Sequence, residues 1–169
     1  MKKTIETARL LLRPVTMDDA EDMFEWVSDP AVNRYMPYPL YHSIEQVRVY
    51  ISTIPEDANE FAFCLKETGK VIGAGSVHYD PERNAYELGY NLSRKYWGSG
   101  YATEASEAMI RWAHDELGVH DFCANHANAN AASANVLKKC GFVFDHYGRY
   151  SRFDGSETFD ASFYTMHLE

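Results

Sequence analysis

The pattern of residues 85–127 constrains the fold more than any other part of this 169-residue chain. Apolar side chains alternate with polar ones over 85–92, which predicts a half-buried strand, and they return with a helical period over 101–117. A second strand pattern follows over 119–127. A strand, a helix and another strand in this order predict a parallel crossover unit, which is right-handed in nearly all proteins. The chain is therefore expected to be an α/β protein.

The segments on either side predict further strands and helices around this unit. Thr16 with Asp19 and Ser43 with Gln46 have the spacing of helix-capping pairs. The predicted helices run from these pairs to Asp29 and to Pro55, and a short one spans about 131–139; the predicted strands span 9–13, 61–65, 71–79, 142–153 and 158–168. We expect one domain over residues 1–169, with a mixed, twisted central sheet of about six to seven strands flanked by helices.

The charge and cysteine content narrow the class of protein. Lysine and arginine number 16 and aspartate and glutamate 25, so the net charge is −9, which disfavours nucleic acid or an anionic membrane as a partner and favours a cationic one. No run approaches the roughly 20 apolar residues of a membrane-spanning helix, and the chain start lacks the apolar stretch of a secretory signal. Cys64, Cys123 and Cys140 are widely spaced in apolar contexts, as is typical of reduced thiols. We therefore expect a cytoplasmic protein.

A glycine-rich turn joins the strand at 85–92 to the helix at 101–117. Gly98 and Gly100 stand where the helix begins, so free backbone N–H groups and the positive end of the helix dipole converge there. Such a spot binds an anion, most naturally a phosphate, although an ordinary turn explains a bare Gly-x-Gly at least as well. The motif of a nucleotide-hydrolase loop is missing from the sequence, and Thr103 stands where a dinucleotide fingerprint requires a third glycine.

Three separated segments of the chain resemble one protein family. Residues 87–92 read ELGYNL, residues 96–105 read YWGSGYATEA, and residues 130–142 read NAASANVLKKCGF. In this order they are similar to the motifs of the GNAT superfamily of acetyl-CoA-dependent N-acetyltransferases, and residues 7–13, TARLLLR, are typical of the branch that acetylates the amino termini of ribosomal proteins. The resemblance implies direct transfer of an acetyl group from acetyl-CoA to a primary amine, with CoA as a product.

The resemblance also implies where the cofactor lies. The main-chain amides of residues 98–103 are expected to hold the diphosphate, and the backbone of residues 90–92 to pair with the pantetheine arm, in a cleft between the splayed strands near 85–92 and 119–127. Lys95 replaces the Gln or Arg of the family pattern, which keeps a positive charge but loses the guanidinium fork. The implied cofactor-binding residues are Tyr90, Asn91, Leu92, Lys95, Gly98, Ser99, Gly100, Tyr101, Ala102, Thr103, Asn130, Ser133, Asn135 and Lys138.

Acetylation of an amine requires a base, because free α-amino groups titrate near about 7.7–8.0 and lysines near about 10.4. Glu87 shares its predicted strand face with Gly89 and Asn91, and in similar enzymes a carboxylate there accepts the proton through a water. The alternative is that Glu87 is a solvated residue of a half-exposed strand. His126 is a second candidate base, although a strand histidine more often only forms hydrogen bonds.

The departing thiolate benefits from a proton donor. Many GNAT enzymes use a tyrosine in the helix of the third segment, and Leu137 occupies that position here. Similar members of the branch indicate Ser133 as the donor, directly or through water, although a polar residue in the first turn of a short helix is an equally good reading. Asn130 is the predicted N-cap of that helix and, by resemblance, also faces the pantetheine amide. The reaction requires no metal, and none is expected.

The connector over residues 35–42 is rich in aromatic residues and proline and cannot be helical throughout. With three aromatic residues of the last predicted hairpin it is expected to wall the acceptor pocket, although local core packing explains them equally well. Those three residues are Tyr147, Tyr150 and Phe153, and the expected substrate-binding residues are Tyr35, Tyr38 and Tyr150.

The acceptor is expected to be a primary amine, either a protein amino terminus such as that of a ribosomal protein or a small amine. Two other functions fit the same residues. A module that binds acetyl-CoA without turnover is favoured by the leucine at position 137, and an acetyltransferase for a polyamine or aminoglycoside suits the negative charge. Homodimerisation is common among similar proteins.

Overall fold

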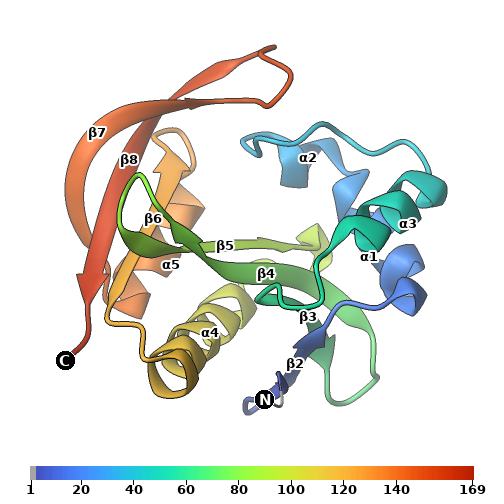
Figure 1. The fold of residues 1–169 in the computed structure, drawn as a ribbon. Coiled ribbons are helices and arrows are strands. Elements are labelled where there is room, and N and C mark those ends of the chain that lie inside the picture. The colour runs from blue at the N-terminus through green and yellow to red at the C-terminus, as the bar shows by residue number, and fades with distance from the viewer. Residues whose placement is uncertain (1–2) are drawn as a thin grey trace.

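A computed structural model describes residues 3–169, and one mixed sheet runs through it in the order β1-β2-β3-β4-β5-β6-β8-β7 (Figure 1). Its strands are β1 (Ile5–Glu6), β2 (Leu10–Pro14), β3 (Glu60–Leu65), β4 (Val71–Asp80), β5 (Ala85–Leu92), β6 (Asp121–Ala127), β7 (Val143–Ser151) and β8 (Thr158–His167). The predicted mixed α/β sheet is confirmed, with eight strands where about six to seven were predicted. The additional strand, β1, has two residues, too few to leave an alternating pattern in the sequence.

The helices begin and end close to their predicted positions. They are α1 (Ala20–Val27), α2 (Pro30–Asn33), α3 (Ile44–Thr53), α4 (Tyr101–Leu117) and α5 (Ala131–Cys140), with single helical turns at Met17–Asp19 and Arg94–Tyr96. Thr16 and Ser43 stand at helix starts, as the capping pairs predict. Helix α2 was not predicted: it is one turn, begun by Pro30 after an Asp29 cap, and is too short to show a helical period.

The sheet has a helix layer on each face. Helix α4 packs on one face through Met109 and Trp112, and α1 and α3 cover part of the other. The sheet is closely packed at Gly73 and Gly75: a Cβ on Gly73 would lie 2.5 Å from the Asn91 carbonyl oxygen, and one on Gly75 would lie 2.8 Å from Met109 Cε on α4. Within residues 3–169, no helix combines the length and the apolar character needed to cross a membrane.

Strands β5 and β6 are parallel and joined by α4, so the predicted crossover unit is confirmed. Their pairing is restricted to two positions, Tyr86 with Phe122 and Glu87 with Cys123. On its other edge β5 pairs with β4 along its whole length. The two parallel strands therefore diverge beyond Glu87, and the divergence lies next to the start of α4.

Candidate active site

The start of helix α4 leaves backbone donors without partners inside the helix. The first intrahelical bond is donated by Glu104 N to the Gly100 carbonyl oxygen at 3.0 Å, so the amides of residues 101–103 have no acceptor in the helix. Gly100 is the N-cap in a left-handed conformation (φ 83°), without a side-chain cap. Gly98 is also left-handed (φ 75°), and the space where its Cβ would lie is open to 4 Å. Together with the dipole of a 17-residue helix, this arrangement fits a diphosphate.

Arg9 lies beside this turn although it is far away in the sequence. Its Nη2 atom is 3.5 Å from the position of a Cβ on Gly100, and its guanidinium lies over the Tyr101 ring, 4.0 Å from the centroid. Glu104 Oε1 accepts a hydrogen bond from Arg9 Nε at 2.8 Å and so fixes the side chain. No role is predicted for Arg9 from the sequence. Its position inside the 7–13 segment is the sequence feature that points to it.

Lys95 lies in the single helical turn that precedes Gly98 and Gly100, and its side chain forms an ion pair with a residue of helix α1. Its Nζ atom forms an ion pair with Glu25 Oε1 at 2.5 Å, and Glu25 Oε2 pairs with Lys70 Nζ at 3.0 Å. The side chain is largely exposed, so this pair is a weak one. The expected contact of Lys95 with the diphosphate remains a prediction.

The free edge of β5 lies between this turn and β6. Beyond Glu87 the main chain of residues 88–92, which includes the predicted Tyr90, Asn91 and Leu92, has no β6 partner in the part of the chain that the structure describes. Unpaired strand edges accept an extended chain by adding a strand. The arrangement therefore fits the amides of a pantetheine arm.

Ser133, in the first turn of α5, lies between two hydrogen-bond donors. Its Oγ accepts from Asn130 Nδ2 at 3.0 Å and from the Tyr90 hydroxyl at 3.4 Å. Asn130 Oδ1 accepts from Ser133 N at 3.4 Å, which confirms the predicted N-cap. Burial raises the pKa of Tyr90 to about 12, so this hydroxyl stays protonated and remains a donor. With both lone pairs of Oγ engaged, the hydroxyl hydrogen of Ser133 is available for an acceptor in the cleft.

Glu87 lies on the opposite face of β5 from Tyr90, with a side chain about one-third exposed (32%). Its Oε1 atom is 4.0 Å from His78 Nε2 on the neighbouring strand. Burial raises the pKa of Glu87, with the nearby Asp80 carboxylate acting in the same direction and His78 opposing it. A carboxylate with a raised pKa is a better general base for an ammonium proton than an ordinary glutamate.

The same carboxylate belongs to a group that could in principle hold a metal ion. Asp80, Glu87 and Cys123 place their ligand atoms within 4.8 Å of one another. Burial, the largest effect on Cys123, raises the pKa of its thiol to about 11, which disfavours the thiolate that metals bind. His126 is engaged elsewhere: its ring nitrogens contact the Ala127 carbonyl at 2.7 Å and the Tyr164 hydroxyl at 3.2 Å.

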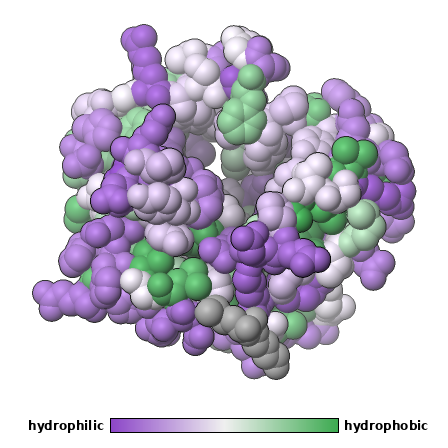
Figure 2. All heavy atoms as spheres, in the orientation of Figure 1, coloured by the Kyte–Doolittle hydropathy of each residue, from purple (hydrophilic) through white to green (hydrophobic). Residues whose placement is uncertain are grey.

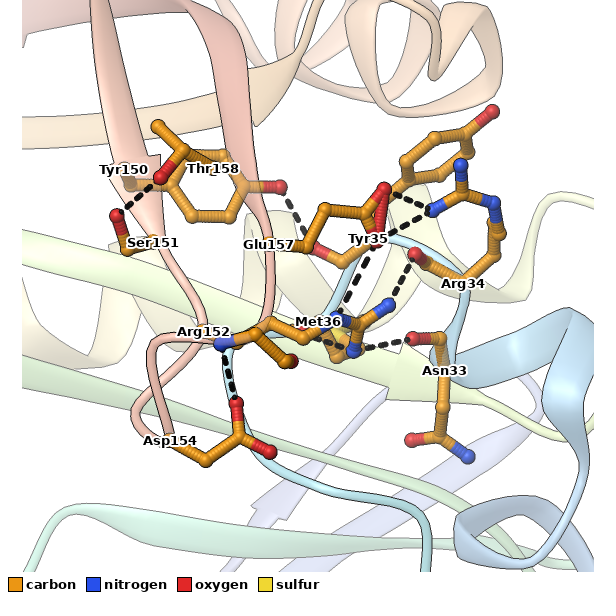
Figure 3. Close-up of polar contacts among 11 residues, drawn as sticks. Asn33, Arg34, Tyr35, Met36, Tyr150, Ser151, Arg152, Asp154, Glu157 and Thr158 are labelled. Carbon is orange, nitrogen blue, oxygen red and sulfur yellow. Dashed lines mark hydrogen bonds and ion pairs between the residues drawn. The ribbon is translucent and has the colours of Figure 1, made fainter.

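The tip of the β7–β8 hairpin is fastened to the connector that follows α2. Arg152 donates from Nη1 to the Met36 carbonyl at 2.9 Å and from Nη2 to the Arg34 carbonyl at 2.8 Å (Figure 3). The Tyr150 hydroxyl donates to the Tyr35 carbonyl at 2.6 Å. The hairpin and the connector are therefore held together above the sheet. Tyr35 and Tyr150 are predicted at the acceptor site from the sequence, whereas Arg152 is not.

These contacts surround an opening in the molecule. Figure 2 shows a narrow hollow in the region between the hairpin, the connector and the sheet. Tyr38 of the connector reaches the sheet, where its hydroxyl accepts from Asn91 Nδ2 at 2.5 Å. Tyr147 and Phe153 are 73% and 79% exposed, so the local-core alternative is wrong for both, while their place in the wall of an acceptor pocket remains a prediction.

The remaining predicted residues lie at the edges of the site. Asn135 and Lys138 are exposed on α5, and Leu137 is buried in the core under that helix. A surface cavity of about 580 Å³ lies elsewhere, between α4 and the end of β8, and includes none of the predicted site residues. Most of the predicted site residues thus lie at the divergence of β5 and β6, at the starts of α4 and α5, and under the connector, whereas Lys95 pairs with α1 and Asn135 and Lys138 lie further along α5.

Comparison with known proteins gives a consistent result. The profile described as "Acetyltransferase (GNAT) domain" matches residues 9–143. The uncharacterized N-acetyltransferase p20 of Bacillus licheniformis is 33% identical over 146 residues, covering 83% of this chain and 82% of the relative. The [ribosomal protein uS5]-alanine N-acetyltransferase of Escherichia coli is 27% identical over 175 residues, covering 91% and 86%. The crystal structure of a GNAT-family acetyltransferase from Bacillus anthracis has a TM-score of 0.87 at 27% identity, covering 97% of this chain and 98% of that one.

Proposed function

Because this chain belongs to the acetyltransferase (GNAT) family, whose members use acetyl-CoA, we propose that its acceptor is a primary amine at the end of a narrow chain, such as a protein amino terminus or a small amine. The observation that carries this proposal is the position of Glu87. Its carboxylate, with a raised pKa, lies where β5 leaves β6 and on the face that the connector covers. A base there meets the acceptor beside the thioester.

Glu87 acts as the general base. Acetyl-CoA, when bound, supplies the acetyl group as a thioester. Glu87 takes the proton of the acceptor ammonium through a water, which leaves a neutral nitrogen that attacks the thioester carbon; the C–N bond forms and the C–S bond breaks. His78, 4.0 Å away, opposes the rise in the pKa of Glu87 when its ring is protonated.

As the C–S bond breaks, Ser133 donates a proton to the departing sulfur and recovers one, through water, from the attacking nitrogen, which loses its second proton as the amide forms. Its Oγ already accepts from Asn130 and Tyr90, so its own hydrogen is free to point into the cleft. Ser133 thus takes the role of the tyrosine that many family members have at the position of Leu137. With a proton donor present, the leucine at this position no longer favours a binding module without turnover.

The anionic part of the cofactor lies at the start of α4. The amides of residues 98–103 donate to the diphosphate, and the guanidinium of Arg9 supplies the fork that Lys95 lacks. The main chain of residues 90–92 pairs with the pantetheine arm. Asn130 and the exposed Asn135 and Lys138 border the same cleft from α5.

The enclosed entrance supports an acceptor that is a chain end. The Arg152 contacts hold the hairpin against the connector, so an amine reaches Glu87 through a closed rim. A chain end or a small molecule passes such a rim, whereas a side chain within a folded surface does not. The likeness to an enzyme named for the alanine of ribosomal protein uS5 supports the amino terminus.

We propose that residues 1–169 form one catalytic domain, because the strands from β1 to β8 all belong to one sheet. The proposed location is cytoplasmic, which the three free thiols Cys64, Cys123 and Cys140 support. The proposed assembly is a homodimer. The solvent-exposed edge strand β7, with Val143 and Phe144 on its surface, supports this assembly.

Thiol release from acetyl-CoA tests the proposal. The purified protein is mixed with acetyl-CoA and an alanine-initiated peptide, hexylamine, or the same peptide already acetylated at its amino terminus. We expect steady CoA release and one added acetyl group, by mass spectrometry, with a free amine and none with the blocked peptide. Calorimetric binding of acetyl-CoA without release from any amine contradicts the proposal and identifies a binding module.

A further inference from the structure

The sheet face that α1 and α3 partly cover has open space over Gly89, two residues from Glu87. The strand register places Glu60, Ser76 and Gly89 in one row across β3, β4 and β5, and His78 and Glu87 in the next row. Residues paired in this way direct their side chains to the same face. The residues at the base of this space are small: Gly89 has no side chain, and a Cβ placed on it would contact only Ser76 Oγ, at 3.6 Å. We call this the Glu60 recess.

Three tyrosines form one wall of the Glu60 recess. Tyr50 and Tyr41 are in edge contact with ring centroids 6.3 Å apart, and Tyr41 and Tyr38 follow at 6.5 Å. The Tyr50 hydroxyl donates to Glu60 Oε1, and the Tyr38 hydroxyl accepts from Asn91 Nδ2. The wall thus runs continuously from Glu60 on β3 to Asn91 on β5.

Glu60 is a partly buried carboxylate without a cationic side chain to pair with. Its hydrogen-bond donor is the Tyr50 hydroxyl, and the nearby group of opposite charge, when its ring is protonated, is His78, which also acts on Glu87. Among the ion pairs of residues 3–169, none joins Glu60 to a lysine or arginine. Burial raises the pKa of Glu60, as expected for a carboxylate that loses solvent without gaining a partner charge.

A second acceptor atom at the recess is also unsatisfied. Asn91 Oδ1 is buried and has no hydrogen-bond partner among the described residues, because the Asn91 amide group uses only its nitrogen toward Tyr38. Buried polar atoms in native proteins are nearly always paired. Glu60 and Glu87 thus offer a ligand carboxylate oxygens that no lysine or arginine occupies, and Asn91 Oδ1 is an unpaired acceptor on the same strand face as Glu87.

We propose that the Glu60 recess binds a second cationic group of the acceptor, so that the preferred acceptor is a dication whose reacting amine lies at Glu87. This inference rests on the proposed function. Glu60 and Glu87 are two strands and two residues apart, so their Cα atoms are separated by about 12 Å, and the two nitrogens of the acceptor lie closer together than this. Alkyl diamines and amino-terminal peptides with a basic second residue both have two separated cationic nitrogens.

The pairing of Glu60 with Tyr50 makes it a specificity residue and not a catalytic one. The hydroxyl of Tyr50 holds one carboxylate oxygen and leaves the other for an incoming ammonium. The tyrosine faces add cation–π attraction, and the negative charge of the chain draws a dication more strongly than a monocation. The effect is expected in KM, because the second nitrogen binds remotely from the reacting atoms.

Matched acceptors test the inference and separate its two sources. One arm compares hexamethylenediamine with hexylamine, and the other compares alanyl-lysine amide with alanyl-norleucine amide. We expect kcat/KM to favour the dication by about tenfold in at least one arm, mainly through KM. In Glu60→Gln this preference disappears, whereas Glu56→Gln, which removes the same charge from an exposed loop position, retains it.

Tyr50→Phe keeps the carboxylate but removes its donor, and we expect about half of the preference, on a logarithmic scale, to be lost. If Glu60→Gln does not fold, the inference is tested by the ratios of kcat/KM for dication and monocation in Tyr50→Phe and in the wild type. Equal kcat/KM for dication and monocation in both wild-type arms overturns the inference, as does a preference that survives in Glu60→Gln. In either case acetylation of hexylamine leaves the proposed function standing, while no CoA release with any amine removes the proposed function itself.

Discussion

The two sides of strand β5 offer a ligand opposite chemistry. Around its free edge lie hydrogen-bond donors and a positive charge, from the amides of residues 101–103 and the guanidinium of Arg9. On the face under the connector lie acceptor atoms and negative charge, from Glu60, Glu87 and Asn91. One strand thus separates a surface suited to an anion from a surface suited to a cation. These charges favour binding of the diphosphate at the free edge of β5 and of the ammonium under the connector.

The starts of α4 and α5 show how such a difference arises locally. Helix α5 satisfies its own first turn, because the Asn130 side chain accepts from Ser133 N. Helix α4 begins at Gly100, which has no side chain to do so. The uncapped helix keeps its amides for a ligand, whereas the capped helix uses its first turn to orient one hydroxyl.

The largest expected effect is on the acceptor side. Glu87→Gln is expected to lower kcat by about a hundredfold or more, since the amide cannot take a proton, while KM for acetyl-CoA stays unchanged. The raised pKa of Glu87 makes wild-type activity fall as pH decreases through a value above the ordinary glutamate range, and this acidic limb is expected to vanish in the variant. Steady-state rates across pH measure both.

Glu82→Gln, at an exposed turn near the same strand, is the control for lost charge. An equal fall of kcat in both variants would show that overall charge, and not the base, matters. A weaker affinity for acetyl-CoA in Glu87→Gln would contradict the assignment of cofactor and acceptor to different sides of β5.

Ser133→Ala is expected to lower kcat by about thirtyfold, less than the base because a thiolate is a better leaving group than an alkoxide. The deficit should shrink as pH rises above about 8.5, where a thiol departs without a proton. Pre-steady-state CoA release across pH measures it. Ser52→Ala, on the exposed side of α3, is the control, and a pH-independent deficit would argue for a structural role of Ser133.

Gly100→Ala is expected to raise KM for acetyl-CoA by about tenfold with kcat retained, because alanine resists a φ of 83° and would shift the amides. Gly118→Ala places the same strain (φ 68°) at the other end of the same helix. Both variants should lose similar thermal stability, and only the first should lose acetyl-CoA affinity by calorimetry. Equal affinities would remove the diphosphate from the start of α4.

The smallest effect concerns Arg9. Arg9→Gln is expected to raise KM for acetyl-CoA about threefold, and the difference should narrow at high salt because the guanidinium is partly exposed. The exposed Arg48→Gln on α3 is the matched control. An unchanged KM in Arg9→Gln would restrict the cofactor side of β5 to backbone groups.

Predictions from sequence succeeded where the responsible interactions are local. Helix α4 has the predicted bounds because Gly100 and Gly118 both take the left-handed conformation that interrupts a helix. The contact of Asn130 with Ser133 spans three residues and could also be predicted. Helix α2 and strand β1 were missed because one turn or two residues carry no period.

The parts of the site that were missed depend on residues far apart in the chain. Arg9 reaches Glu104 across 95 positions, and Arg152 reaches Met36 across 116. Neither pairing leaves a local pattern, because sheet order and hairpin curvature bring the residues together. The exposure of Tyr147 and Phe153 had the same origin, since the face of a hairpin that meets solvent is set by its neighbours.

By itself, the amino-acid sequence determined the crossover unit, the uncapped glycine start of α4 and the family to which the chain belongs, because periodicity, caps and glycine conformations act over a few residues. Tertiary structure alone decided where β5 parts from β6 and which charges line each side of β5. It also brought Tyr50 to Glu60, and Tyr38 to Asn91 across 53 residues. Strand register and helix packing fix such meetings, and they are properties of the whole chain.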